Sequence, residues 1–352
     1  MMRGAALTLL TAALLAAEPA PGFTQRLVPN AELSGDTDRS GLVERTLGLM
    51  GTEVSLLVRS DDRPGALAAI EAAIAEMVRL EAIMTDWNEA SELMRVNREA
   101  YAAPVPVGAE LFACLQEGVE VGRLTDGAFD ITWRSAGRYW NFKADPPRLP
   151  EPELVARAAE LIDFHHVHLD PASRSVRLGK VHTQIGLGGV AKGWIIDRAM
   201  EVIKARGFKH AVVNAGGDLM VSGRNTGDRL WWVAIRHPRD PAQNLAVVPV
   251  ANLAIVTSGD YERFVEIDGK RYCHIFDPRT GWPASGCQSV TVLAANAARA
   301  DALATGLFVL GPEQGLALAE RLEGVEAMIV AADGSVRITT GLQRGQASGG
   351  GG

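Results

Sequence analysis

The sequence predicts an α+β fold of mixed sheets with packed helices, arranged as two interlocked lobes. Helix-like and strand-like patterns follow one another without the regular rhythm of a doubly wound parallel sheet. Hairpin signals such as Asp268-Gly269 and Asp333-Gly334 recur in the second half of the chain. No linker-like composition interrupts residues 46–342, so we expect one continuous domain there.

Composition and charge narrow the class of protein. The chain has 352 residues, of which 47% are hydrophobic and 22% charged, as in an ordinary globular protein with a large core. The formal net charge is −7, whereas a sequence-independent nucleic-acid binder needs a basic footprint. We therefore expect no nucleic-acid partner. Any bound phosphate must be met locally by a lysine, a metal ion or backbone amides.

The first 20 residues are typical of a secretory signal peptide. Arg3 precedes an apolar run from Ala5 to Ala17, which is too short for a stable membrane span. An uncleaved membrane anchor is the alternative. We expect an exported, periplasmic protein, with or without association with the inner membrane. Residues 21–45 are expected to form a linker, and the Gly-rich residues 343–352 a flexible tail.

The first half of the domain is expected to contain a broken strand, three helices and a hairpin. The strand, 46–59, is interrupted at Met50-Gly51-Thr52, and a helix then opens at Pro64, where proline suits the first turn. Further elements are predicted as helices at 110–124 and 152–163, a loop at 134–150 and a hairpin at 166–178.

The second half is expected to be richer in short strands. A helix opens near Val190 and ends before Gly207, and a buried strand over 210–223 is broken by Gly216-Gly217-Asp218. The remaining predicted elements are strands at 230–236, 245–250, 254–257, 264–276 and 289–293, and helices at 297–310 and 312–322.

The stretch 184–197, QIGLGGVAKGWIID, is the first candidate for a ligand site. A β-branched run leads into Gly186, Gly188 and Gly189, and a helical pattern follows. Backbone N–H groups at such a helix start bind anions well. Lys192 lies in the first turn, where a cation is misplaced electrostatically unless a phosphate or carboxylate faces it. A tight corner with a solvated lysine explains the same residues.

Asp301 and Thr305 are four residues apart on a predicted helix and so project from one face. A carboxylate with a hydroxyl is hard oxygen ligation that suits Mg²⁺, which takes few protein ligands and keeps several waters. The alternative is structural, with Asp301 capping the helix and Thr305 packing against its neighbours.

His274 begins the segment HIFDPRTG, in which a strand runs into a turn. Histidine accepts a proton near neutral pH, so His274 is a candidate base, although a hydrogen-bonded strand histidine is the simpler alternative. The polar loop 258–263, SGDYER, follows an apolar strand, and such loops often carry binding groups.

Two other groups of residues carry weaker hypotheses. His165, His166 and His168 suggest zinc, but the sequence offers no further ligand nearby, and an exposed hairpin edge explains them better. The three cysteines are too few for a disulfide framework, although a Cys273–Cys287 pair is conceivable in an oxidising compartment.

Eight blocks, in order, resemble the ApbE family of FAD:protein FMN transferases over roughly residues 46–340. They are MGT, MTDWNEASELMRVN, TDGAFDIT, LGGVAKGWIID, NAGGDLMVSG, TSGDYERF, HIFDPRTGWP and ARADALATGLF. An ordered set is far more specific than any one block. The resemblance implies an enzyme that binds FAD between two lobes, uses Mg²⁺ and transfers FMN to an exported acceptor protein, releasing AMP. The acceptor would be a threonine hydroxyl in a short Gly-containing segment.

The resemblance also implies roles for particular residues. His274 and Asp301 would be catalytic, and the Gly189 carbonyl, Asp301 and Thr305 would hold the magnesium ion. Segments 214–218 and 258–263 would form neighbouring walls. The residues expected to contact FAD are Met50, Trp87, Ala128, Phe129, Asp130, Gly186, Lys192 and His274.

The implied chemistry is physically coherent. A metal ion and Lys192 would neutralise the charge of the diphosphate, and we expect the metal to be the dominant catalyst. A threonine hydroxyl is a poor nucleophile, so a base must take its proton, and His274 is the first candidate. His274 could instead only orient a phosphate. Two alternative functions are an FAD pyrophosphatase that yields FMN and AMP, and a non-catalytic FAD carrier.

Gly186 departs from the family pattern. Many members carry Asp here, in a D-L-G-G-x-A-K-G block, whereas this sequence reads Ile185-Gly186-Leu187. Loss of the acid would remove a contact to FAD or a partner of the metal site, which motivates the carrier alternative. Lys192, His274, Asp301 and Thr305 are all present and argue against it.

Overall fold

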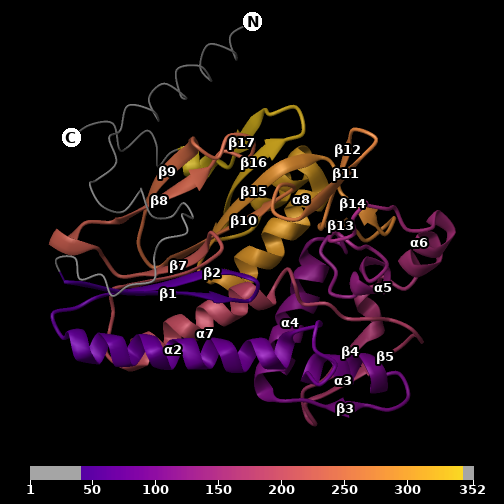
Figure 1. The fold of residues 1–352 in the computed structure, drawn as a ribbon, viewed down its shortest axis with the longest axis horizontal. Helices are drawn as coiled ribbons and strands as arrows, with labels where there is room; N and C mark the ends of the chain where they lie inside the picture. The colour runs from indigo at the N-terminus through magenta and orange to yellow at the C-terminus, as the bar shows by residue number, and fades with distance from the viewer. Residues whose placement is uncertain (1–40, 344–352) are drawn as a thin grey trace, which may run out of the picture.

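The computed structural model describes residues 41–343. The predicted signal peptide, linker residues 21–40 and tail residues 344–352 lie outside them. An eight-stranded sheet forms the centre of the described part (Figure 1). In spatial order its strands are β1 (Leu42–Leu49), β2 (Thr52–Arg59), β6 (Ala211–Ala215), β7 (Asp218–Ser222), β10 (Leu253–Gly259), β15 (Cys287–Ala294), β16 (Glu326–Ala331) and β17 (Val336–Ile338).

The predicted α+β class is confirmed by this arrangement of sheets and helices. Strand direction is more uniform than the predicted mixed sheets, because every pairing in the large sheet is antiparallel. The strands also come from widely separated parts of the chain. For example, β2 pairs with β6, so the two sides of the sheet are joined by long connections that carry helices.

The N-terminal strands differ from the prediction in two ways. β1 begins at Leu42, so residues 42–45 of the expected linker pair with β2, and the folded domain begins before Thr46. The predicted interruption of one strand is a hairpin turn between two strands. Met50 and Gly51 have φ values of 54° and 69°, which is the pattern of a tight hairpin whose two central residues are left-handed.

Three long helices cover one face of the sheet: α2 (Arg63–Met84), α7 (Ala191–Ala205) and α8 (Ala297–Ala319) (Figure 1). The strands supply alternate side chains to this face. On β2, Val54 and Leu56 lie in the core with these helices, whereas Leu57 belongs to a cluster on the opposite face. This period of two is expected for a sheet that is covered on both sides.

The opposite face is covered by the hairpin β8 (Trp231–Arg236) and β9 (Asn244–Val250). Trp231, Val233 and Val250 pack there against residues of the large sheet that include Leu57 and Val212. The central strands are therefore buried on both faces, which gives the site a rigid base.

Helix α8 joins the two helices predicted at 297–310 and 312–322. A break remains inside it, where Gly311 has a φ of 82° and Pro312 follows. Among residues 41–343, α8 is the helix whose length and composition would allow it to cross a membrane. In this structure it packs in the core against β10, β15, β16 and α7.

A second lobe lies beside the sheet and contains α3 (Glu92–Glu99), α4 (Ala109–Leu124), α5 (Arg134–Gly137) and α6 (Pro152–Ala159) (Figure 1). The predicted hairpin at 166–178 is confirmed as β4 (Val167–Asp170) and β5 (Ser175–Leu178), to which β3 (Val105–Pro106) adds. The two lobes are packed together through α4 and α8.

Short elements complete the described chain. The predicted strand over 264–276 is a hairpin that turns at Asp268-Gly269, as the turn signal indicated. Its strands are β11 (Phe264–Ile267) and β12 (Lys270–Cys273), followed by β13 (Phe276–Asp277) and β14 (Trp282–Pro283); the 3₁₀ turns are η1 (Phe164–His166) and η2 (Thr226–Asp228).

Candidate active site

The site is built around the crossing of α7 and α8. Gly193 permits the close approach, because a Cβ at this position would collide with the Ala297 carbonyl. One turn further along α7, the Asp197 carboxylate accepts hydrogen bonds from the N–H groups of Ala297 and Ala298, at 2.8 and 2.9 Å. These contacts hold the beginning of α8 against α7.

Asp301 lies at this crossing and is 4% exposed. Its carboxylate accepts a hydrogen bond from the Gly193 N–H, at 3.0 Å. In a regular helix that N–H would bond to the Gly189 carbonyl, so the Gly189 carbonyl is left outside the helical ladder. Asn296 caps α8, which rules out the capping alternative for Asp301. Burial raises the pKa of Asp301 to about 7, against the opposing attraction of Lys192.

The three predicted metal ligands share one neighbourhood. A Cβ on Gly189 would lie 3.1 Å from Thr305 Oγ1, so the glycine loop rests directly on α8 one turn beyond Asp301. Thr305 Oγ1 is also 3.3 Å from Ser258 Oγ. Carboxylate, hydroxyl and free carbonyl oxygens fit a small hard cation such as Mg²⁺. No group of three His, Cys, Asp or Glu suited to a metal occurs within residues 41–343, so a softer cation has no comparable site there.

Lys192 faces a carboxylate, as its position in the first turn of α7 requires. Its Nζ lies 2.5 Å from Asp218 Oδ2, and Asp218 Oδ1 accepts a hydrogen bond from the Thr257 N–H at 2.9 Å. Desolvation lowers the pKa of Lys192, but the attraction of Asp218 and Asp301 is larger and places it above its ordinary value. The alternative of a solvated lysine is therefore wrong.

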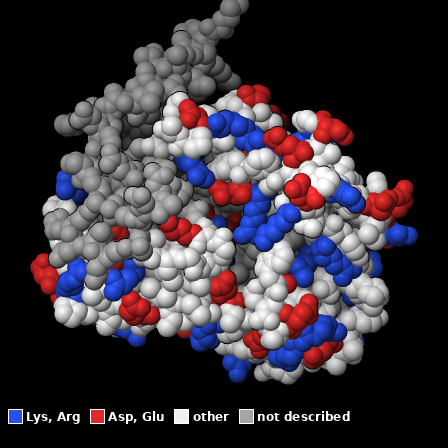
Figure 2. Space-filling view, in the orientation of Figure 1, with Lys and Arg blue, Asp and Glu red and all other residues white. Residues whose placement is uncertain are grey.

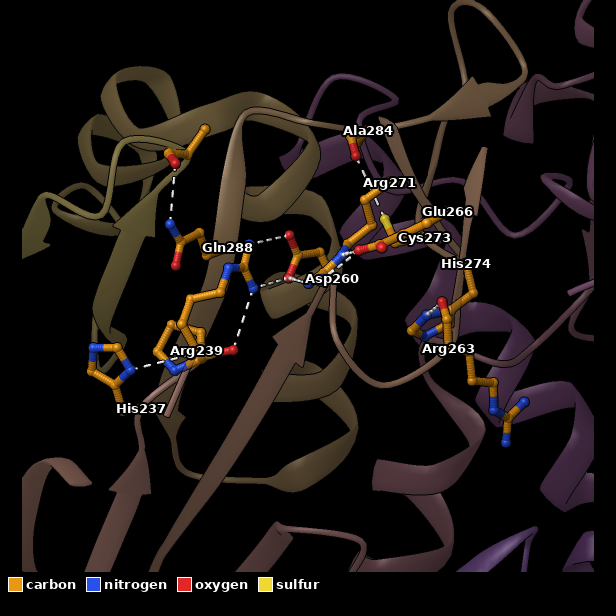
Figure 3. Close-up of polar contacts among 12 residues, drawn as sticks. His237, Arg239, Asp260, Arg263, Glu266, Arg271, Cys273, His274, Ala284 and Gln288 are labelled. Atoms are coloured by element: carbon orange, nitrogen blue, oxygen red, sulfur yellow. Dashed lines mark hydrogen bonds and ion pairs between the residues drawn. The ribbon is translucent and has the colours of Figure 1, made fainter. Parts of the chain in front are cut away.

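His274 is held by the carbonyl of Arg263 (Figure 3). The backbone N–H and the ring Nδ1 of His274 lie 3.0 and 3.3 Å from that oxygen. A carbonyl can only accept, so Nδ1 carries the ring proton and Nε2 has a free lone pair. Burial, the charge of Arg263 and the charge of Lys192 lower the pKa of His274 to about 4. The ring is neutral at pH 7 and can accept a proton at Nε2.

The combination of these residues matches one known family. The model of the ApbE family matches residues 50–329. The chain belongs to the ApbE family. Relatives named FAD:protein FMN transferase include one from Treponema pallidum, 36% identical over 290 residues, which are 78% of this chain and 80% of the relative. Another, from Vibrio cholerae, is 34% identical over 255 residues, which are 71% and 75% of the two chains.

Solved structures agree with this membership. The ApbE protein of Thermotoga maritima superimposes with a TM-score of 0.80 at 30% identity, covering 87% of this chain and 99% of that one. The flavin transferase ApbE of Vibrio cholerae gives a TM-score of 0.76 at 26% identity, covering 86% and 98%. The predicted family and fold are confirmed, and the comparisons support an enzyme of the flavin transferase class.

Two of the residues expected to contact FAD in this ApbE protein lie on the surface or in a turn. Trp87 is 82% exposed, with Lys143 Nζ 5.9 Å from its ring centroid, so it is not a core aromatic residue. One face of its ring is available for stacking. Met50 lies in the β1–β2 turn and packs in part against the core.

The segment 128–130 is buried, and the side chain of Asp130 is bonded within the fold. Its carboxylate accepts hydrogen bonds from the Thr132 N–H (2.7 Å), the Thr132 hydroxyl (2.6 Å) and the Phe164 N–H (2.8 Å). These bonds use the side chain inside the fold. Phe129 packs against the loop that contains Gly189, because a Cβ on Gly189 would lie 3.1 Å from its ring. Ala128 is 6% exposed.

Gly186 packs closely against its surroundings. Its N–H donates to the Ile131 carbonyl at 2.8 Å, and its own carbonyl accepts from Trp133 Nε1 at 2.9 Å. A Cβ on Gly186 would lie 2.9 Å from the Trp133 indole. Both backbone groups have partners within the fold, and the expected contact of Gly186 with FAD stays a prediction.

The structure does not support the zinc hypothesis for the three histidines or the disulfide hypothesis for the cysteines. His165 pairs with Asp163 at 2.7 Å, and His165 and His166 lie in η1, so His166 and His168 do not share a strand face. Cys114, Cys273 and Cys287 are free and buried, so the conceivable Cys273–Cys287 pair is not formed. Burial raises the pKa of Cys273 to about 11, which makes it a poor nucleophile.

Sequence reasoning missed the individual roles of Trp133, Asp197 and Asp218. For Asp218 a signal existed, because a lysine in the first turn of a helix called for a carboxylate opposite. Nothing in the sequence said which carboxylate, since Asp218 is on another element. Asp197 and Trp133 act through contacts to segments far along the chain, which a pattern within one element cannot reveal.

Proposed function

We propose that this ApbE family protein transfers FMN from FAD to a threonine hydroxyl of an exported acceptor protein, with Mg²⁺ bound and AMP released. The flavin transfer itself is the activity named for its relatives. The observation that carries the rest is that the charge of Lys192 acts on both Asp301 and neutral His274, while Asp301 takes the Gly193 N–H and leaves the Gly189 carbonyl free. We place the reaction in the periplasm, where the signal-like residues 1–20 would direct the chain.

The charged residues suit a diphosphate substrate. The Gly189 carbonyl, Asp301 and Thr305 would hold Mg²⁺, which when bound supplies positive charge to phosphate oxygens. Lys192 adds a second positive charge that is oriented by Asp218 before the substrate arrives. Preorganised charges of this kind stabilise a transition state better than mobile ones.

His274 supplies the proton acceptor. In the proposed step the threonine Oγ forms a bond to the phosphorus on the FMN side, and the bond from that phosphorus to the bridging oxygen breaks. AMP leaves with the bridging oxygen and the bonding electron pair. The hydroxyl proton passes to His274 Nε2, the nitrogen that the Arg263 carbonyl leaves free.

The test is a reaction of the mature protein with FAD, Mg²⁺ and an acceptor domain that carries a threonine in a short Gly-containing segment. We expect the acceptor to gain the mass of FMN less water, and AMP to appear in equal amount. Free FMN and AMP without an adduct would identify a pyrophosphatase instead. FAD binding without either product would identify a carrier.

Variants of one residue separate metal binding from substrate binding. Asp301→Ala should abolish the adduct, and Asp301→Asn should weaken the response to Mg²⁺ more than it weakens FAD binding. Asn keeps an oxygen for the Gly193 N–H but loses the charge. Asp333→Ala, at an exposed hairpin with only local hydrogen bonds, is the matched control. An equal Mg²⁺ response in Asp301→Asn and wild type would contradict the proposed metal site.

A further inference from the structure

Arg263 joins two parts of the site that are far apart in the sequence. It lies just before β11, and its carbonyl holds both the backbone N–H and Nδ1 of His274. At the other end of the same residue, guanidinium Nη2 is 3.4 Å from the position that a Cβ on Gly51 would occupy. The side chain therefore reaches from His274 to the β1–β2 turn that contains Met50.

Charge pairing separates Arg263 from the other basic residues around it. Four of those have a carboxylate partner, in the pairs Lys192–Asp218 (2.5 Å), Arg236–Glu262 (2.7 Å), Arg239–Asp260 (2.6 Å) and Arg271–Glu266 (3.0 Å), and Lys270 faces the Tyr272 ring. Within residues 41–343, no hydrogen bond or ion pair is found for the Arg263 guanidinium, which extends away from the Asp260 network (Figure 3). Lys and Arg side chains gather near the centre of the face shown in Figure 2.

The chemistry of FAD identifies an anion for this guanidinium. The flavin and adenine rings are uncharged at neutral pH, so the diphosphate is the part of FAD that can pair with a cation. The planar fork of arginine matches two phosphate oxygens at once. Lys192 is already matched by Asp218, which leaves Arg263 as a cation of this neighbourhood whose charge the described residues do not neutralise.

We propose that Arg263 binds a phosphate group of FAD and so positions the diphosphate against His274. The inference rests on the proposed function, since it takes FAD as the ligand. It gives Arg263 two tasks in one residue: the carbonyl sets the tautomer of His274, and the guanidinium sets the place of the phosphate.

The test measures flavin binding by quenching of flavin fluorescence, without added metal and without acceptor. Arg263→Ala should weaken FAD binding about 10- to 100-fold, the size expected for a charged hydrogen-bonded contact. Arg263→Lys should recover part of the loss, because the charge returns without the fork. Riboflavin, which has no phosphate, should bind wild type and Arg263→Ala alike.

A matched control is Lys270→Gln, which removes one positive charge from the exposed turn of the β11–β12 hairpin, where Lys270 faces the Tyr272 ring. We expect this variant to keep the FAD affinity of wild type. If Arg263→Ala does not fold, as judged by circular dichroism, Arg263→Gln takes its place in the same comparison.

Three results would overturn the inference: equal FAD affinity in Arg263→Ala and wild type, an equal loss for riboflavin, or a loss confined to the affinity for the acceptor. Failure of the proposed function gives a different result. In that case the wild type forms no FMN adduct, whatever the FAD affinity of the variants. If wild type transfers FMN while Arg263→Ala binds FAD normally, the inference fails alone.

Discussion

Trp133 occupies the space into which an acidic side chain at position 186 would extend. Its indole lies 2.9 Å from a Cβ built on Gly186, donates a hydrogen bond to the Gly186 carbonyl and stacks on Phe276 with a centroid distance of 5.4 Å. The missing acid is therefore accompanied by a tryptophan that fills its place. The departure at Gly186 is a change in packing, and it leaves Lys192 paired with Asp218 and Asp301 bonded to the Gly193 N–H.

We predict that Gly186→Asp destabilises the protein by about 1–3 kcal/mol, because the added atoms overpack against Trp133. Trp133→Ala should also destabilise, through the lost hydrogen bond and stacking. Together the two changes should cost less than their sum, since the smaller residue makes room for Asp. Denaturant unfolding of the four proteins measures this coupling, and strictly additive losses would contradict it.

The low pKa of His274 predicts a particular pH dependence. In the free enzyme this pKa is about 4, so at saturating Mg²⁺, which would keep Asp301 ionised, the acid limb of kcat/KM that belongs to His274 should lie near pH 4 and not near the ordinary histidine value of about 6.5. The diphosphate should move the limb of kcat upward, because nearby negative charge favours the protonated ring. A pH–rate series measures both limbs. A limb near pH 6.5 that is present in wild type at saturating Mg²⁺ and absent in His274→Gln would contradict the low pKa of His274.

The same pKa links stability to pH. Between about pH 4 and 6.5 the unfolded chain holds a proton on His274 that the folded protein does not, so the contribution of His274 to stability rises with pH across this window, opposite to the contributions of Asp301 and Asp197, whose pKa values are raised. The full contribution is present above pH 6.5 and is lost as the pH falls toward 4. His274→Gln should show a shallower fall than wild type in thermal unfolding. Parallel curves would count against the assignment.

At the scale of elements, the α7–α8 crossing determines where Asp301 lies. Asp197→Ala would leave two N–H groups at the start of α8 without their acceptor, which should cost about 1–3 kcal/mol of stability. Because α8 carries Asp301 and Thr305, the two side chains proposed to bind Mg²⁺, the Mg²⁺ concentration for half-maximal activity should also rise. Urea unfolding and a Mg²⁺ titration measure the two effects. Glu201→Ala, whose partner Arg198 is on the same helix, is the control.

Elements with local signals could be predicted from the sequence. The period of the α2 residues, the proline in its first turn and the Asp268-Gly269 turn are all found in the structure. The first strand was placed four residues late, because Leu42 and Val43 directly follow the polar linker and are too short an apolar signal by themselves; the segment becomes a strand by pairing with β2. Strand order was not predictable, since it depends on which distant strands meet.

In the candidate site, too, local features could be predicted and contacts between distant segments could not. Each motif by itself indicates the chemistry of its residue, and these residues are Lys192, Asp301, Thr305 and His274. The partner of Lys192 could not be named, because Asp218 reaches it only through the packing of α7 on β7. The structural role of Asp130 could not be predicted, because its carboxylate accepts hydrogen bonds from Thr132 and from the distant Phe164.

At the scale of the whole molecule, the site draws on the β1–β2 turn, α7, β7, the loop after β10 and α8, which the large sheet holds together. A ligand bound there would contact elements from the beginning and from the end of the domain. It should therefore stabilise the folded state of the whole domain. At one hundred times its Kd, a ligand adds about 2.7 kcal/mol. FAD with Mg²⁺ should thus raise Tm by several degrees, and by less in Asp301→Ala. No shift in either protein would contradict a site shared among these elements.

The Lys192–Asp218 pair has a consequence for selectivity. A lysine that already has its counterion offers little to a stray inorganic anion, because such an anion must displace a carboxylate that is buried and oriented by the Thr257 N–H. A dinucleotide is different, since its rings and its other contacts supply binding free energy that a small anion lacks. We therefore expect the pair to disfavour binding of phosphate and sulfate from the surroundings at Lys192 itself.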